Sequence, residues 1–128
     1  ADMWSVGVVF GELFLGTILF MGSSNMDQLR EIILKLGWPT ENDLKDMNPN
    51  INKFDEIDGI YGVNNTERGE SWSMIFCGVF DMEETAQEII SEILVYSPDD
   101  RLSALECLCH EYFDNVIKKK TKKINIPN

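Results

Sequence analysis

Three residues near the carboxyl end of the chain carry side chains that could bind a metal ion. Cys107, Cys109 and His110 supply the thiolate and imidazole groups that zinc prefers. Spacings of two and three residues on one short helix do not converge tetrahedrally, and no second pair of ligands lies nearby in the sequence. We therefore expect no metal site, and we interpret Cys107 as a core residue.

Paired carboxylates are the second candidate for chemistry, because two acids in one site can act as general acid and general base. The pairs are Glu83-Glu84 and Asp99-Asp100. Each pair stands next to a predicted helix start or turn, where acids are favoured for local reasons. We interpret both pairs as a solvated surface and not as a catalytic dyad.

The composition is that of a soluble globular protein with one domain. The chain has 128 residues, of which 44% are hydrophobic and 26% are charged. Its formal net charge of −11 argues against nucleic acid as a partner, because phosphate contacts require positive charge. The exception is the basic tail, residues 118–128, whose charge run is typical of a poorly ordered terminus.

The three cysteines indicate the compartment. They cannot all pair with one another, and their spacing differs from that of secreted disulfide scaffolds. The chain also lacks a basic segment followed by a cleavable apolar core at its amino end. These features predict a reducing compartment, either cytoplasmic or nuclear.

The segment from Met3 to Met21 is similar to a membrane span, because it approaches the ~20 apolar residues that a bilayer requires. Glu12 and three glycines interrupt it, and a central acid costs about 2.5–3.5 kcal/mol on insertion scales. We predict instead a helix buried in protein, which Asp2 can cap and whose dipole Asp2 complements. The membrane alternative predicts solubility that depends on detergent.

Helical signals recur along the rest of the chain, and no strand pattern of useful length occurs. Ser24 or Asn25 can cap a second helix that Gly37 ends, and Ser103 with Glu106 forms the capping box of the last helix. The predicted helices lie near residues 2–16, 25–36, 40–47, 83–95 and 103–109.

The helical signal weakens between residues 51 and 82, because glycines and acids recur there. We predict an irregular surface connection over these residues, long enough to be functional or mobile. The predicted fold class is nevertheless all-α.

Three stretches of the chain resemble the large lobe of eukaryotic protein kinases. "DMWSVGVVFGEL" is similar to the central helix of that lobe, and "SPDDRLSALECLCHEYF" is similar to its final segment with its arginine. Between them, "SSNMDQLREIILKLGWPT" followed by "MNPN" resembles the branch that contains cyclin-dependent, mitogen-activated and glycogen synthase kinases. The run "MNPN" is most similar to glycogen synthase kinase 3. The resemblance extends from residue 1 to about residue 113.

This resemblance implies a fold and a parent protein. The fold is the helical C-terminal portion of a protein kinase large lobe, a central apolar helix with amphipathic helices, over residues 1–117. The basic tail at residues 118–128 follows it. The parent is a serine/threonine kinase that acts on a protein substrate with ATP and Mg²⁺ as cofactors. A scaffold helix is a further candidate partner, whereas no nucleic acid or membrane partner is expected.

The motifs that carry out phosphoryl transfer do not occur in this sequence. We find no His-Arg-Asp, no Asp-Phe-Gly, no Ala-Pro-Glu and no strand with Val-Ala-x-Lys. The segment therefore has no catalytic, cofactor-binding or metal-binding residue of its own, and we expect it to be inactive alone. The alternative is a stand-alone or pseudokinase-derived helical module that docks a partner helix.

Four residues take their roles from the resemblance. The acid that matches Asp2 accepts hydrogen bonds from backbone amides of the catalytic loop and so supports that loop. The arginine that matches Arg101 pairs with the glutamate of Ala-Pro-Glu at the end of the activation segment. Trp4 and Gly7 match positions where a bulky ring and a close backbone approach build the core. From the residues alone, Arg101 would be a surface arginine that follows two aspartates.

A partner-helix groove is also implied, because the matching surface of glycogen synthase kinase 3 receives an amphipathic helix from scaffold proteins. The residues placed there are Ile33, Leu34, Ile51 and Phe54. Arg30 stands where the family has an apolar residue, and Ile51 replaces an aromatic one. Core packing explains Ile33 at least as well.

The acidic stretch at residues 55–71 is longer than the family's connection at this point and is typical of a lineage-specific insert. If the remainder of the lobe is absent, the central helix loses much of its cover and exposes a large apolar surface. We then expect the isolated chain to be unstable, to aggregate or to self-associate through that helix.

Overall fold

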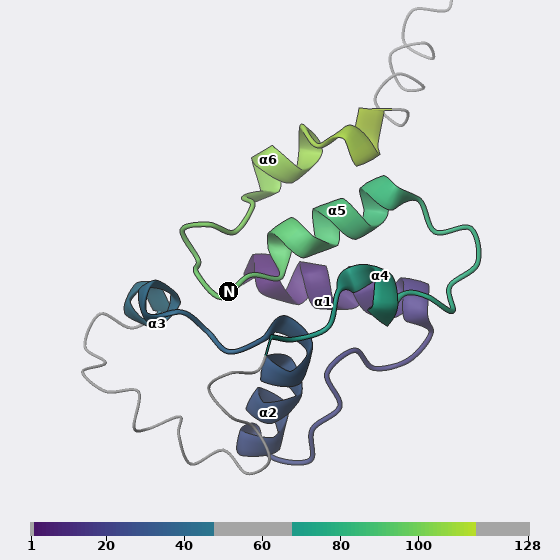
Figure 1. Ribbon diagram of the computed structural model, residues 1–128. Coiled ribbons are helices and arrows are strands. Elements are labelled where there is room, and N and C mark those ends of the chain that lie inside the picture. The colour runs from purple at the N-terminus through teal and green to yellow at the C-terminus, as the bar shows by residue number, and fades with distance from the viewer. Residues whose placement is uncertain (1, 48–67, 115–128) are drawn as a thin grey trace, which may run out of the picture.

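The structure is a computed structural model, and it describes residues 2–47 and 68–114. Within these ranges all regular structure is helical, and no strand occurs (Figure 1). The prediction of an all-α fold is therefore confirmed. The predicted basic tail at residues 118–128 lies outside the described residues. The helices are α1 (Asp2–Leu15), α2 (Asn25–Leu36), α3 (Glu41–Met47), α4 (Trp72–Ile75), α5 (Glu84–Ile93), α6 (Ala104–Leu108) and the 3-10 helix η2 (Glu111–Phe113).

Helices α1 and α5 form the centre of the arrangement. They lie side by side and run in opposite directions (Figure 1). Helix α4 and the 3-10 helix η2 also pack on α5. In the view of Figure 1, α2 lies on the side of α1 that is opposite to α5. Helix α5 is therefore the element on which α1, α4 and η2 pack.

The buried core collects around α5. Along this helix Ala86, Ile89, Ile90 and Ile93 are buried, and their spacing turns one face of the helix inward, as the sequence periodicity predicts. Other elements contribute the buried residues Leu19, Phe20, Phe76, Leu94 and Cys107. The interpretation of Cys107 as a core residue is confirmed.

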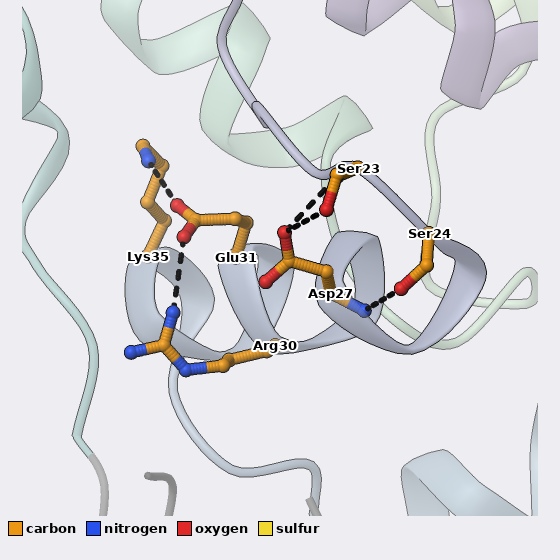
Figure 2. Close-up of polar contacts among 6 residues, drawn as sticks. All are labelled: Ser23, Ser24, Asp27, Arg30, Glu31 and Lys35. Atoms are coloured by element: carbon orange, nitrogen blue, oxygen red, sulfur yellow. Dashed lines mark hydrogen bonds and ion pairs between the residues drawn. The ribbon is translucent and has the colours of Figure 1, made fainter. Parts of the chain in front are cut away.

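Two consecutive serines precede helix α2. Ser24 is the N-cap, and its Oγ accepts a hydrogen bond from the backbone N–H of Asp27 at 3.1 Å (Figure 2). The Asp27 carboxylate accepts hydrogen bonds from the backbone N–H and the hydroxyl of Ser23, at 3.0 and 3.1 Å. These two bonds, the backbone one first, lower the pKa of Asp27. Gly37, with a φ of 90°, ends the helix as predicted.

Helix α6 has the capping box that the sequence predicts. Ser103 Oγ accepts from the backbone N–H of Glu106 at 3.1 Å, and Glu106 Oε1 accepts from the backbone N–H of Ser103 at 3.0 Å. The 3-10 helix η2 follows, and its Tyr112 ring meets the Phe10 ring of α1 edge-on at a centroid distance of 5.4 Å. The capped helix and this aromatic contact hold the end of the described chain on α1.

The segment at residues 68–82 differs from the irregular connection that the sequence predicts, because helix α4 forms there. Ser71 is its N-cap and accepts a backbone hydrogen bond within the helix. A helix of four residues is too short to show a hydrophobic repeat, so periodicity does not reveal it. The Trp72 ring stacks on Phe76 at 5.9 Å, and this contact holds the turn on the core. The remainder of the predicted connection, residues 51–67, lies outside the described residues.

Replacing Ser103 by alanine tests the capping box. The change removes the acceptor for the Glu106 N–H, and we expect it to lower the free energy of unfolding by about 0.5–2 kcal/mol. Ser103→Thr keeps a hydroxyl acceptor and should retain most of the wild-type value. Urea unfolding, followed by circular dichroism at one fixed protein concentration, measures both variants. Equal midpoints for Ser103→Ala and wild type would contradict the expected role of the cap.

Candidate functional site

The guanidinium of Arg101 joins the segment after α5 to the start of α1. Its Nη2 donates to the carbonyl oxygens of Val95, at 2.9 Å, and Tyr96, at 3.4 Å. Its Cζ lies 5.2 Å from the ring centroid of Trp4, within the range of a cation–π contact. Burial lowers the pKa of Arg101 from its ordinary value, but an arginine stays charged at neutral pH. The cation is therefore held by two carbonyls and one aromatic face.

One donor of Arg101 is unused. Its Nε is buried and has no hydrogen-bond partner among residues 2–47 and 68–114. A buried donor without an acceptor costs about 1–3 kcal/mol, and more when the group is charged. A carboxylate would complete this guanidinium, because parallel N–H groups match two carboxylate oxygens.

Trp4 links Arg101 to the segment that follows α1. Its ring stacks on the buried ring of Phe20, with a centroid distance of 6.0 Å and an interplanar angle of 13°. Two residues before Trp4, the exposed Asp2 is the first residue of α1 and does not occupy the predicted N-cap position. Its negative charge still complements the helix dipole there. Asp2 and Trp4, the residue that Arg101 contacts, thus lie at the same end of α1.

Gly7 is buried where α1 meets the end of α5. A Cβ atom at Gly7 would lie 2.6 Å from Cγ2 of Ile93 and 2.9 Å from Cδ2 of Leu94. Contacts that short do not persist in a packed interior, so the helices would have to separate or the side chains would have to shift. One turn later, a Cβ atom at Gly11 would lie 3.2 Å from Cδ2 of Leu19. The two glycines therefore permit the close packing of α1.

Residues 1–113 of the chain match the protein kinase domain family. The chain belongs to this family. Over 129 aligned residues it is 39% identical to Protein kinase gsk3 of Schizosaccharomyces pombe (strain 972 / ATCC 24843). The alignment covers 99% of this chain and 30% of that protein, so the kinase segment spans 30% of the length of its curated relative. The resemblance to glycogen synthase kinase 3 that the sequence predicts is confirmed.

The partner-helix groove predicted for this kinase segment is only partly described. Ile33 is fully buried, in agreement with its interpretation as a core residue, and Leu34 is half-buried. Ile51 and Phe54 lie outside the described residues. The groove stays a prediction, and Leu34 is its one described member with an accessible side chain.

One side of α2 in the kinase segment carries three charged, partly buried residues. The Glu31 carboxylate bridges two cations, with Arg30 Nη1 at 3.4 Å and Lys35 Nζ at 3.5 Å (Figure 2). The Lys35 ammonium also lies 6.0 Å from the ring centroid of Phe20. A partner that docks beside Arg30 would meet charged groups and not the apolar surface typical of the family.

The candidate metal ligands do not converge in the kinase segment. Cys107 is buried, Cys109 is exposed, and burial raises the pKa of the Cys107 thiol, which disfavours the thiolate that binds metals. Both ring nitrogens of His110 face protein groups. Its Nδ1 accepts from the backbone N–H of Tyr112 at 3.0 Å, and its Nε2 lies 3.9 Å from the Glu92 carboxylate. No group of three or more potential metal ligands gathers in the described part of the chain.

The paired carboxylates are solvated. Glu83-Glu84 and Asp99-Asp100 are all exposed, and Glu83 stands at the N-cap position of α5. Their interpretation as surface acids is confirmed.

Helix α1 has one covered side and one exposed apolar side. Gly7 and Gly11 are its buried residues, whereas Val6, Val9 and Leu13 are 51%, 56% and 76% exposed. With residues of α5, α6 and η2 these three line an apolar groove of about 440 Å³. The described residues therefore cover α1 on one side only, and enclosure of its other side by protein stays a prediction. None of the described helices combines the length and the apolar character that a membrane crossing requires.

Two polar residues between α5 and Arg101 make hydrogen bonds that the sequence analysis did not predict. They hold the segment that contains Arg101, called here the Arg101 segment. The hydroxyl of Tyr96 donates to the carbonyl of Gly37 at 2.6 Å, and the fully buried Ser97 donates to the Asp46 carboxylate at 2.7 Å. The partners are 59 and 51 residues apart in the sequence, so no repeat or spacing indicates them. These bonds tie the segment to the end of α2 and to α3.

Replacing Gly7 by alanine tests the close approach of α1 and α5. The added methyl group overlaps Ile93 and Leu94, and we expect Gly7→Ala to lower the free energy of unfolding by about 1–3 kcal/mol. Gly78→Ala is the matched control, because a Cβ atom at Gly78 has no neighbour within 4 Å. Urea unfolding at a fixed concentration compares the two. The packing argument fails if Gly7→Ala is no less stable than Gly78→Ala.

Replacing Tyr96 by phenylalanine removes the hydrogen bond to Gly37, and we expect a loss of about 0.5–1.5 kcal/mol at neutral pH. Burial, with a smaller contribution from the charge of Asp43, raises the pKa of Tyr96 above its ordinary value. The stability that comes from this phenol is therefore present below the unfolded-state pKa of about 10 and is lost as the pH rises through the folded-state pKa.

Urea unfolding between about pH 8 and about pH 11 measures this dependence. Wild type should lose stability with rising pH faster than Tyr96→Phe. Parallel pH profiles would show that Tyr96 is not the group responsible.

Proposed function

We propose that this chain is the C-terminal part of the large lobe of a serine/threonine protein kinase, which transfers phosphate from ATP to serine or threonine residues of protein substrates. The observation that carries the proposal is the family match over residues 1–113, together with 39% identity to Protein kinase gsk3 along almost the whole chain. The parent acts in the cytoplasm or the nucleus, as the cysteine usage indicates.

The chain has no phosphoryl-transfer activity of its own in this proposal. The sequence lacks the glycine-rich loop, the strand lysine, His-Arg-Asp and Asp-Phe-Gly, which bind ATP and Mg²⁺ and position the reacting groups in kinases. ATP and Mg²⁺ therefore belong to other parts of the parent kinase, and this segment contributes support.

Asp2 and Arg101 supply that support. The carboxylate of Asp2 is exposed at the start of α1, where it can accept hydrogen bonds from backbone amides of a catalytic loop. Arg101 is partly exposed, so the accessible part of its guanidinium is available to the glutamate at the end of an activation segment. Because Trp4 contacts both Arg101 and Phe20, Arg101 rests on a packed cluster, and Asp2 lies two residues before Trp4 on the same helix.

Replacing Arg101 in the complete kinase tests this role. Arg101→Ala leaves the partner glutamate unpaired, and losing one member of a buried ion pair typically costs about 3–5 kcal/mol. We expect a lower unfolding temperature and reduced phosphorylation of a protein substrate. Arg101→Lys keeps the charge but not the paired N–H groups. It should therefore lower the unfolding temperature and the phosphorylation of the substrate less than Arg101→Ala does.

Lys45→Ala is the control for loss of a cation, because Lys45 is exposed and pairs only with Glu41, at 3.7 Å in the described structure. The proposed role of Arg101 is rejected if Arg101→Ala and Lys45→Ala have the same activity and stability.

A helical module that docks a partner helix is the second candidate function, and the half-buried Leu34 on α2 favours it. The coding sequence upstream of Ala1 distinguishes the two candidates. His-Arg-Asp and Asp-Phe-Gly motifs there support the kinase segment, and a start codon at that point supports the module.

The isolated chain self-associates in this proposal, because the exposed side chains of Val6, Val9 and Leu13 form an apolar stripe on α1. We expect oligomers of the wild-type chain in analytical ultracentrifugation. A carboxylate in the stripe resists burial, so Leu13→Glu should shift the distribution toward monomer.

Leu105→Glu is the matched control, because Leu105 on α6 is 72% exposed and does not line the α1 groove. It should leave the association unchanged. A monodisperse wild-type monomer with a cooperative transition would refute the self-association while leaving the kinase assignment intact.

A further inference from the structure

We draw no further inference here: the strongest candidate, the apolar groove of about 440 Å³ between α1, α5 and the α6–η2 segment, is an unpartnered apolar face, and nothing in the structure shows what covers it.

Discussion

The close contact between α1 and α5 at Gly7 constrains the rest of the structure. A hydrogen atom in place of a side chain lets Ile93 and Leu94 reach the backbone of α1, where a Cβ atom would lie under 3 Å from both. The buried face of α5 then packs against Leu19 and Phe20, which follow α1, and against Phe76, which follows α4. Packed interiors tolerate little change in volume, so the spacing of these two helices cannot vary without displacing the whole cluster.

The Arg101–Trp4 contact depends on this spacing. Arg101 follows α5 and Trp4 lies on α1, so the cation stays over the ring only while the two helices keep their distance. The hydrogen bonds of Tyr96 and Ser97 fix the same segment from the other direction, through the end of α2 and through α3. Arg101 therefore lies in a segment that contacts three elements, namely α1, the end of α2 and α3. Such rigidity suits a support for catalytic residues, because positions held by several contacts move little.

Local signals made much of this fold predictable from the sequence. The cap at Ser24, the stop at Gly37 and the capping box at Ser103 depend on residues within one helical turn, so spacing alone reveals them. Helix α4 was missed because four residues show no repeat. The Tyr96 and Ser97 bonds were missed because their partners lie more than 50 residues away. The roles proposed for Asp2 and Arg101 rest on the family resemblance, because the motifs that they would contact do not occur in this sequence.

The two faces of α1 explain why this segment and the rest of a kinase domain should fold together. One face carries Gly7 and Gly11 and is packed, while the other carries Val6, Val9 and Leu13 and is open. Burying an aliphatic side chain of this size contributes about 1.5–3 kcal/mol. Domains are stable by only about 5–15 kcal/mol, so covering three such residues would supply a substantial part of that total. Covering these three side chains would therefore stabilise the segment, and a helix that is apolar on both faces is consistent with the centre of a larger lobe.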